Sequence, residues 1–479
     1  GRRDPATWVR EQVAALSAMP NVTMRLRTMG AGLYDHGYAL LYERVSEHEP
    51  PRAGTPRHRL WRVRTTQTVV ASGSIERPMT FAMNDVPGVM LAAAVRDYIR
   101  LWGVCPGRKA VVYANNDDAY RTALALHEAG ARVMAVVDTR EAATGELPGR
   151  VRALQIPVLE GHGVARAKGS KRLEGVETGR LKNGAIAAAG QSFEADLLAM
   201  SGGWSPVVHL YSHCGGKLAW DEAGLMFRPH PEAGAPIGPD GEVATRCAGA
   251  ANGELRTGPC LADARIAGRA AAAAAGFAPA GEETAEAVDE PAEAPIEAHW
   301  FTPARDRYAH GHKHWVDYQN DVTAADIRLA AREGYESVEH TKRYTTLGMA
   351  TDQGKTSNIA GLALLAEALC KPIPEVGTTT FRPPYTPISF GSIAGQAAGP
   401  LFKATRRTPM DAWQAENGAD FEPVGDWRRP YCYLRGREDR AAAVRREVLN
   451  TRSKVGLLDA STLGKIEVRG PDAARFLDR

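Results

Sequence analysis

The sequence predicts an α/β protein organised around a parallel sheet, and three observations lead to that prediction. Strand-like runs alternate with helical patterns, glycine turns follow several of those runs, and the composition is that of an ordinary globular protein. Of the 479 residues, 44% are hydrophobic and 24% are charged, which leaves material for several cores. At roughly 150 residues per domain, we expect about three domains.

Charge and cysteine usage exclude several classes of protein. Lys and Arg total 59 against 56 Asp and Glu, a net charge of +3, so we expect no nucleic-acid partner. No apolar run approaches the roughly 20 residues that a membrane span needs, so we expect no membrane association. The cysteines form no CxxC pair, which predicts a reduced, cytoplasmic setting and no metal site. They are Cys105, Cys214, Cys247, Cys260, Cys370 and Cys432.

The elements of the first region follow a strand–helix–strand pattern. Short runs rich in Val and Ala predict buried strands, and apolar residues at helical spacing predict the helices between them. A βαβ unit of this length implies parallel strands. The expected strands lie at residues 60–65, 67–73, 109–113 and 132–138, and the expected helices at 88–101 and 117–129.

Three strand ends carry small residues that would let a cofactor approach the backbone. They are the strand end at 69–74, the turn after the expected strand 195–200, and the segment 247–252, which opens the last strand-to-helix unit. The candidate cofactor contacts there are Ala71, Ser72, Gly73, Gly202, Gly203 and Asn252.

A fourth turn, after the strand 109–113, lacks the glycines that a dinucleotide fold usually carries there. Asn115 and Asn116 tolerate left-handed backbone, and Asp138 ends the next strand where a ribose-binding carboxylate would lie. A glycine-free turn admits a pyrophosphate poorly, however, and Asp117 with its acidic neighbour would repel one. We therefore interpret this half-domain as degenerate and kept for packing, with nucleotide binding as the alternative.

Residues 277–298 are rich in Ala, Pro and acidic side chains and contain no basic residue. Such a segment buries little and repels itself, so we expect an exposed linker after a first domain at 1–276. A functional acidic motif is the alternative. The carboxylates are Glu282, Glu283, Glu286, Asp289, Glu290, Glu293 and Glu297.

A small helical module is expected at 299–371, with a further domain from 372 to 479 after a proline-rich stretch. Thr323 and Asp326 resemble a capping box at the start of the first helix. Three alternating histidines form a plausible metal spacing, but no carboxylate or cysteine supports them. The expected helices lie at 323–333, 337–345 and 359–369, and the histidines are His310, His312 and His314.

The order of these motifs resembles the α subunits of heterotetrameric sarcosine oxidases over essentially the whole chain. The resemblance is carried by VVASG, NDVPGVM and AGAAN in the first region, and by VDYQNDVT, SVEHTKRYTT and GMATDQGKTSN after the linker. It implies a two-dinucleotide-domain oxidoreductase fold whose first glycine loop should lie upstream of residue 1. We therefore expect an internal part of a chain roughly twice as long.

In related dehydrogenase subunits, the module resembling residues 317–358 binds an iron–sulfur cluster through four cysteines. Asp317, Gln319 and Asp352 stand at cysteine positions in this sequence. A cluster needs thiolate ligands, so we predict that none binds here. The module is then a scaffold, or it is adapted to another ligand.

The resemblance also implies a flavin mononucleotide (FMN) held at the interface with the β subunit, with a covalent attachment to that partner. A glycine, a cation and hydroxyls at a helix N-terminus favour a phosphate. Helix capping by Ser357 or Asn358, with an exposed lysine, is the alternative. The candidate flavin contacts are Arg343, Gln353, Lys355, Thr356, Ser357 and Asn358.

The region from 372 resembles the start of the α+β aminomethyltransferase fold, which binds tetrahydrofolate. The folate-binding carboxylate should lie beyond Arg479, so this chain alone would not complete the folate site. Within the chain, Asp459 and Lys465 are expected to be structural.

The activity that the resemblance implies is oxidation of sarcosine by O2 to glycine and H2O2, with the one-carbon unit passing to tetrahydrofolate. FAD would lie on the β subunit, with NAD on this chain, in a complex with β, γ and δ subunits; the residues themselves identify no catalytic group. A dehydrogenase subunit for proline, opines or another secondary amine, a non-catalytic assembly scaffold, and a folate-dependent methyltransferase acting alone are the alternatives.

Overall fold

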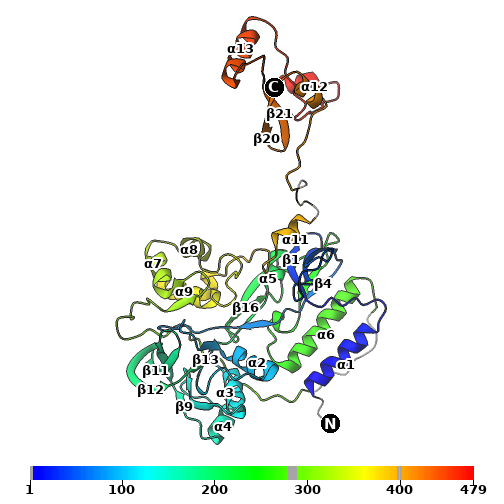
Figure 1. Ribbon diagram of the computed structural model, residues 1–479. Helices are drawn as coiled ribbons and strands as arrows, with labels where there is room; N and C mark the ends of the chain where they lie inside the picture. Colours follow the sequence, from blue (N-terminus) through cyan, green and yellow to red (C-terminus); the bar gives the residue numbers. More distant parts are fainter. Residues whose placement is uncertain (1–3, 279–287, 396, 398, 400–401) are drawn as a thin grey trace. The chain divides into compact units, whose positions relative to one another are not determined.

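The computed structural model describes residues 4–278, 288–395, 397, 399 and 402–479. The chain forms two compact units, Gly1–Ile388 and Ser389–Arg479, which are taken one at a time below (Figure 1). Three acidic residues of the predicted linker, Glu282, Glu283 and Glu286, lie outside the described residues.

A five-stranded parallel sheet is the centre of the first unit and confirms the predicted α/β class. Its strand order is β6-β13-β7-β8-β9, and every neighbouring pair is parallel. The carboxyl ends of the strands therefore meet at one edge, where α/β folds place their ligands. The strands are β6 (Val89–Leu91), β13 (Leu197–Ser201), β7 (Lys109–Ala114), β8 (Arg132–Asp138) and β9 (Val158–Glu160), and the helices are α2 (Ala92–Trp102), α3 (Asp118–Glu128) and α4 (Glu146–Ala153).

The helix expected at 88–101 is shorter in the structure. Residues Val89–Leu91 form β6 beside β13, and α2 begins at Ala92. The backbone N–H of Ala93 donates to a Glu76 carboxylate oxygen at 2.7 Å, which satisfies one of the free donors of the first helical turn. Long-range strand pairing thus outweighs the local helical pattern at this end.

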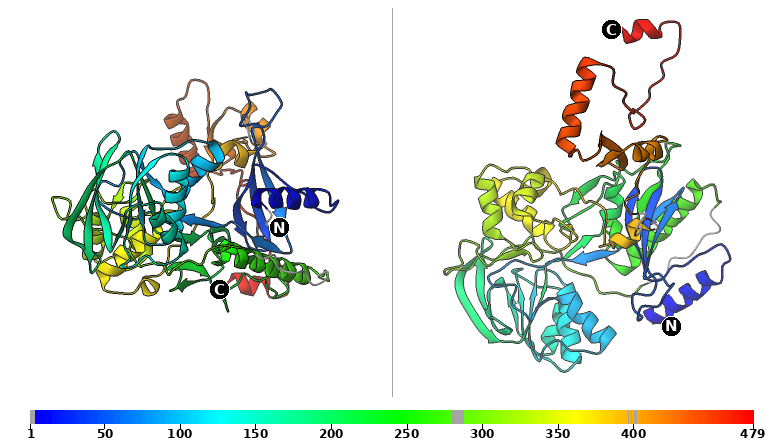
Figure 2. Two further views of the ribbon diagram at one scale, coloured as in Figure 1. Left: turned by 90° about the horizontal axis from the view of Figure 1, so that it is seen from below. Right: turned by 45° about the horizontal axis from the view of Figure 1, so that its top comes forward.

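A three-stranded antiparallel sheet, which the sequence patterns did not predict, lies between β9 and β13 along the chain. One apolar cluster joins the parallel sheet to α2–α4 and includes Val112 and Tyr120. A second cluster joins the opposite face to the antiparallel sheet and includes Tyr113 and Val176. Helices and antiparallel sheet therefore cover opposite faces of the parallel sheet (Figure 2). The antiparallel strands are β10 (His162–Gly169), β11 (Leu173–Lys182) and β12 (Ala185–Glu194).

The rest of the first β region is assembled from segments far apart in the sequence. β4 pairs in parallel with β17, and β5 pairs with β14 in antiparallel fashion. The chain enters the central sheet region after β5 and returns through β14. These two paired strands therefore form a two-stranded connection, which we call the hinge. The elements are α1 (Pro5–Ser17), β1 (Thr28–Tyr34), β2 (Tyr38–Arg44), β3 (His58–Arg64), β4 (Thr68–Val70), β5 (Ser74–Glu76), β14 (Trp204–Pro206), α5 (His209–His213), β15 (Leu218–Asp221), β16 (Met226–Pro229), β17 (Thr245–Cys247), a 3-10 turn η1 (Gly249–Asn252) and α6 (Thr257–Ala274).

The helical module completes the first unit. The predicted capping box is confirmed: the Asp326 N–H faces the Thr323 hydroxyl, and the Asp326 carboxylate accepts from the Thr323 N–H at 2.8 Å. The module has its own core, which includes Ile327, Leu347 and Leu362. Its elements are β18 (Trp315–Asp317), β19 (Val322–Thr323), α7 (Ala324–Arg332), α8 (Val338–Thr345), α9 (Asn358–Leu369) and α10 (Ile373–Val376).

In its described residues, the second unit contains the hairpin of β20 and β21 and helices of 5 to 14 residues. Asp459 accepts hydrogen bonds from Thr408 at 3.0 Å and Gln414 at 2.7 Å, which supports its predicted structural role. Among the described helices of either unit, none is both long and apolar enough to span a bilayer. The elements are α11 (Phe390–Ala394), α12 (Asp411–Glu416), β20 (Ala419–Val424), β21 (Trp427–Tyr433), α13 (Arg440–Ser453) and α14 (Ala473–Leu477).

Candidate functional site

The first group of predicted cofactor residues lies at the shared end of β4 and β17. Val70 pairs with Cys247, so the turns that contain Ala71–Gly73 and Asn252 leave the same edge. Ala71 and Ser72 are exposed, and a Cβ added to Gly73 would meet no atom within 4 Å. This edge therefore leaves backbone open to a ligand, as a nucleotide site requires.

Side chains in this group also make structural contacts. The Ser72 hydroxyl donates to the Val207 carbonyl at 2.6 Å, which ties the turn to the hinge. The Asn252 amide donates to Asp263 at 3.1 Å, and the Gly249 N–H donates to the same carboxylate at 2.7 Å. The two turns are thus held in place by neighbours on one side and are open on the other.

Gly202 and Gly203 are buried beside Arg77. Gly203 has a φ of +87°, and a Cβ there would lie 2.3 Å from Ile296 and 2.4 Å from the Arg77 guanidinium. The Gly202 carbonyl accepts from Arg77 Nε at 3.0 Å. Close packing against Arg77 and Ile296 is why glycine is required here.

The glycine-free turn is covered by the chain's own residues 293–299, which we call the covering segment. The Asn115 side-chain amide donates to the Glu297 carbonyl at 2.9 Å, and the Glu297 N–H donates to the Asn115 carbonyl at 3.0 Å. The Ala294 N–H donates to the Asp117 carboxylate at 2.7 Å. A nucleotide at the ends of β7 and β8 would have to displace this segment.

Asp138, at the predicted ribose position, is already saturated with hydrogen bonds. It accepts from the Tyr120 hydroxyl at 2.7 Å and from Arg140 Nη2 at 2.8 Å, and Arg140 also pairs with Asp117 at 2.8 Å. Burial, with the Asp138 charge, raises the pKa of Tyr120, which therefore stays a neutral donor. These contacts support the interpretation of this turn as a packing element.

In the helical module, the buried Asp317 carboxylate holds the surrounding loops together. One oxygen accepts from the backbone N–H groups of Gln319 and Asn320, each at 3.0 Å. The other accepts from the Gly348 N–H at 2.7 Å and from the Ser357 hydroxyl at 3.3 Å. The residue at a predicted cysteine position thus organises the loop by hydrogen bonds. Among the described residues, no group of three or more His, Cys, Asp or Glu side chains could hold a metal ion.

The flavin candidates cluster on the loop that leads into α9, except Arg343, whose exposed side chain bonds Glu339 on α8. Lys355 Nζ donates to the carbonyls of Thr351, Asp352 and Tyr385 at 3.3, 3.0 and 2.9 Å, and burial lowers its pKa. All three donors of this ammonium are therefore engaged by the protein.

Two of the remaining flavin candidates, Gln353 and Asn358, are hydrogen-bonded within the protein, whereas the Thr356 side chain is not. Gln353 donates to the Ala350 carbonyl at 2.6 Å and accepts from the Arg382 N–H at 3.1 Å. The Asn358 amide donates to Thr379 at 3.0 Å. The Thr356 hydroxyl makes no hydrogen bond with the described part of the chain, so it has capacity for a ligand.

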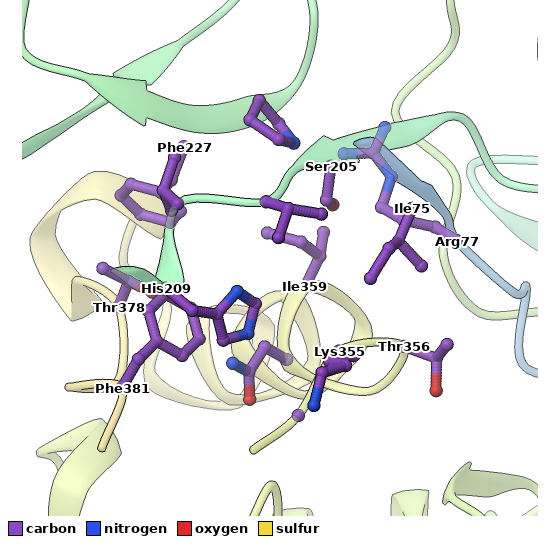
Figure 3. Close-up of a pocket in the computed structure, with 15 residues that line it drawn as sticks. Ile75, Arg77, Ser205, His209, Phe227, Lys355, Thr356, Ile359, Thr378 and Phe381 are labelled. Carbon is purple, nitrogen blue, oxygen red and sulfur yellow. The ribbon is translucent and has the colours of Figure 1, made fainter. Parts of the chain in front are cut away.

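Thr356 lies at two hollows of the first unit. One is a cavity of about 40 Å³ between the hinge and the start of α9 (Figure 3). The other is an open groove of about 260 Å³ that also includes Asp85, Met90 and Tyr318. The cavity is lined by Ile75, Arg77, Ser205, Pro206, Val207, Val208, His209, Phe227, Gly354, Lys355, Thr356, Asn358, Ile359, Thr378 and Phe381.

Sequence patterns missed Arg77, Ser205 and His209 as members of this site. Arg77 follows β5, Ser205 lies within β14, and His209 begins α5.

Two family models match the chain. Residues 311–396 match the sarcosine oxidase A3 domain, and residues 410–479 match the GCVT N-terminal domain.

Curated relatives extend this similarity to the full chain. The sarcosine oxidase alpha subunit of Corynebacterium sp. (strain P-1) is 41% identical over 100% of this chain and 49% of its own length. The protein of the same name from Rhizobium meliloti (strain 1021) is 39% identical over 99% of this chain and 46% of its own length. The chain therefore spans about half the length of these relatives.

One further relative and one solved structure show more distant similarity. A subunit of opine oxidase from Rhizobium meliloti (strain 1021) is 23% identical over 70% of this chain and 78% of its own length. Among solved structures, L-proline dehydrogenase from P. horikoshii has a TM-score of 0.59 at 20% identity, covering 82% of this chain and 69% of that one. This structural likeness shows that the chain shares the fold of that protein.

Proposed function

Because this chain is related along its whole length to the alpha subunits of sarcosine oxidases, we propose that it is part of a multi-subunit flavoenzyme that oxidises sarcosine with O2. The products are glycine, H2O2 and a one-carbon unit that passes to tetrahydrofolate. The single observation that carries this proposal is the 41% identity over the whole chain. The proposed partners are β, γ and δ subunits, in the cytoplasm, with FAD on the β subunit.

The flavins supply the redox chemistry of such an enzyme, and the protein positions them and the substrate. For this chain, the exposed edge at Ala71, Ser72 and Gly73 fits a nucleotide, since Gly73 leaves the backbone open. We propose that NAD binds at this edge, with Asn252 at the neighbouring turn and Gly202 and Gly203 shaping the hinge.

The proposed FMN surface is the loop before α9. Thr356 contributes a hydroxyl that is free among the described contacts, beside the groove lined by Met90 and Tyr318. Gln353, Lys355, Ser357 and Asn358 hold the loop in shape through the bonds described above, and Arg343 presents a cation from α8. On this proposal, the β subunit covers the groove, which completes the site.

The GCVT-like second unit supports the folate part of the proposal. In this chain, the Asp459 carboxylate is kept charged by its hydrogen bonds with Ser461, Gln414 and Thr408, which lower its pKa to about 2. It therefore fixes the local fold of the second unit.

The test uses the full reading frame copurified with its neighbouring subunits. We expect a bound-flavin spectrum and sarcosine-dependent O2 uptake with H2O2 formation, and we expect tetrahydrofolate to capture the one-carbon product. Thr356→Val should weaken FMN retention, with Thr351→Val, on the exposed side of the same loop, as the matched control.

Other outcomes favour the alternatives. Bound flavin with dye reduction by proline or an opine, but without O2 uptake, would identify a dehydrogenase. An assembled complex without flavin would contradict both the oxidase and the dehydrogenase, and would leave a scaffold or a methyltransferase.

A further inference from the structure

The first unit contains two lobes, and the chain passes directly between them only at the hinge, where β5 pairs with β14. One lobe, which we call the edge lobe, consists of residues 4–76 and 204–276 and carries the strand ends of β4 and β17. The other, the sheet lobe, consists of residues 77–203 and contains the parallel sheet. Figure 1 shows α1 and α6 in the edge lobe and α2, α3 and α4 in the sheet lobe. A connection of two short strands can absorb a change of angle between the lobes that it joins.

The segment before the helical module is attached to the edge lobe at the first turn of α6. The N-cap residue of α6, Arg256, gives that turn no side-chain hydrogen bond. Instead, the Glu290 carboxylate accepts from the backbone N–H groups of Thr257 at 3.0 Å and Gly258 at 3.2 Å. Burial opposes its ionisation, but the hydrogen bonds from Gly258 and Thr257 lower the pKa of Glu290. Glu290 is therefore a charged cap of α6 that comes from a distant part of the sequence.

Three residues further along, the same segment is attached to the sheet lobe. Glu293 pairs with Arg121 of α3 at 2.9 Å, and the Ala294 N–H donates to the Asp117 carboxylate at 2.7 Å. These contacts continue into the covering segment described above. Three residue steps span at most about 10 Å, so a very short length of chain holds α6 of one lobe close to α3 of the other.

The helical module also contacts both lobes, but through other residues. Trp220 and Phe227 of the edge lobe pack against its core. Thr80 of the sheet lobe exchanges backbone hydrogen bonds with Trp300 and Thr302 at the start of the module. In the described structure, no residue of α3 or α6 belongs to the core of the module. The contacts of the segment with α6 and α3 are therefore a further attachment between the lobes, made by helices that take no part in the hinge or in that core.

We propose that residues 290–297 form a strap that fixes the angle between the two lobes, attached to α6 by Glu290 and to α3 by Glu293. After the hinge and the module, this third attachment removes rotations that the first two leave free. Because α6 also carries Asp263, which bonds the turn at Asn252, the strap sets where the open edge at β4 and β17 lies relative to the parallel sheet. The strap acts through these contacts alone and requires no ligand or substrate.

The test measures the distance between the lobes by pulsed electron paramagnetic resonance, on the full reading frame copurified with its neighbouring subunits. Non-natural residues that carry spin labels replace Thr55 in the edge lobe and Cys105 in the sheet lobe, both at exposed positions. We expect one narrow distance distribution in the otherwise wild-type complex. Glu290→Ala should broaden this distribution by about twofold, because the lobes can then rotate about the hinge. Glu128→Ala, which removes an exposed carboxylate of α3 outside the strap, is the matched control and should leave the distribution narrow.

Hydrogen exchange distinguishes a strap from a local helix cap. Glu290→Ala should speed exchange at the Thr257 amide in either case, because that amide loses its acceptor. A local cap would leave the distance distribution between the lobes unchanged, and that result would overturn the proposal. If Glu290→Ala does not assemble, Arg121→Gln provides the comparison, because it breaks the other end of the strap at Glu293. An unchanged distribution in Arg121→Gln would overturn the proposal as well.

Discussion

Glu76 and Arg77 are adjacent buried ionisable residues whose side chains serve different neighbours. The Glu76 carboxylate accepts from Ala93 at the start of α2, whereas Arg77 bonds the hinge at Gly202. Burial raises the pKa of Glu76 to about 7 from an ordinary 4.5, against the smaller opposing effects of the hydrogen bonds from Ala93 and Ser201 and of the Arg96 charge. Glu76 is therefore a buried acid whose charged form the fold disfavours.

This raised pKa predicts a pH-dependent stability. Between about pH 4.5 and 7 the unfolded chain has released the Glu76 proton while the folded chain retains it, so stability falls as pH rises through this window. Glu76→Gln keeps the acceptor for Ala93 and removes the charge. At pH 8 we expect it to raise the free energy of unfolding by about 3 kcal/mol, measured by thermal melting.

At pH 4 the same variant should match wild type, which serves as the internal control. Glu128→Gln, at an exposed position on α3, should change the stability at neither pH. A constant difference at all pH values would contradict the assignment of Glu76 as the titrating group.

Asp317 leads to a second residue-scale prediction. In Asp317→Asn, an NH2 group would face donors that now point at a carboxylate oxygen, so at least two charge-assisted hydrogen bonds are lost. We expect the free energy of unfolding to fall by about 3 kcal/mol in chemical denaturation. Asp321→Asn, at an exposed position with a φ of +53°, should be nearly neutral, since Asn tolerates that conformation.

At this scale, sequence patterns located residues with distinctive local chemistry. They found the open turn at Gly73 and the loop at Thr356, because glycine and hydroxyl residues next to strand and helix ends are visible locally. They did not find His209 or Arg77, since the role of these side chains comes from segments more than a hundred residues away in sequence.

At the scale of elements, the covering segment makes a third prediction. Asp117→Asn removes the charge that faces both the Ala294 N–H and Arg140, so residues 293–299 should open more often. Hydrogen exchange at the Ala294 and Glu297 amides should speed up by about tenfold, detected by mass spectrometry.

The control for this experiment is Asp97→Asn on α2, an exposed position outside the contact. Its exchange pattern over residues 293–299 should equal that of wild type. Unchanged exchange in Asp117→Asn would show that the segment is held by its other contacts, against this prediction.

The elements themselves were predicted unevenly. The strand at 132–138 agrees with β8, and the buried strand at 109–113 differs from β7 by one residue, because both are continuous apolar runs in a parallel sheet. The sheet β10–β12 was missed, since β12 is rich in alanine and largely exposed and so shows little alternation. The linker was predicted as exposed, yet part of it is tied to the central sheet by backbone hydrogen bonds that no composition reveals.

At the scale of the whole molecule, the division into two compact units predicts where a protease cuts first. The four apolar clusters of buried residues found in the described structure all lie in the first unit. Lys403 is exposed between that unit and the helix α12. We expect brief trypsin digestion of the purified chain to cut after Lys403 and to leave an intact first unit, identified by mass spectrometry.

Lys403→Gln should remove this early cut, while Lys371→Gln should not, because Lys371 lies within the first unit on a loop paired to Glu336. Early fragments ending inside residues 4–278 would contradict the division. The sequence predicted the α/β class and a domain boundary near residue 372, where a proline-rich stretch begins. Only tertiary contacts show that the first unit continues to Ile388.

The covering segment also has a consequence for protein engineering. Introducing a GxGxxG sequence in the turn after β7 would reproduce a nucleotide-binding signature, yet the space above this turn is already filled by the chain's own backbone. We therefore expect the glycine-rich sequence to leave the affinity for dinucleotides unchanged. It would also remove the hydrogen bonds that Asn115 and Asp117 make with the covering segment. At the sheet edge where such folds usually bind a ligand, the residues of this chain instead bind the chain's own backbone at Ala294 and Glu297.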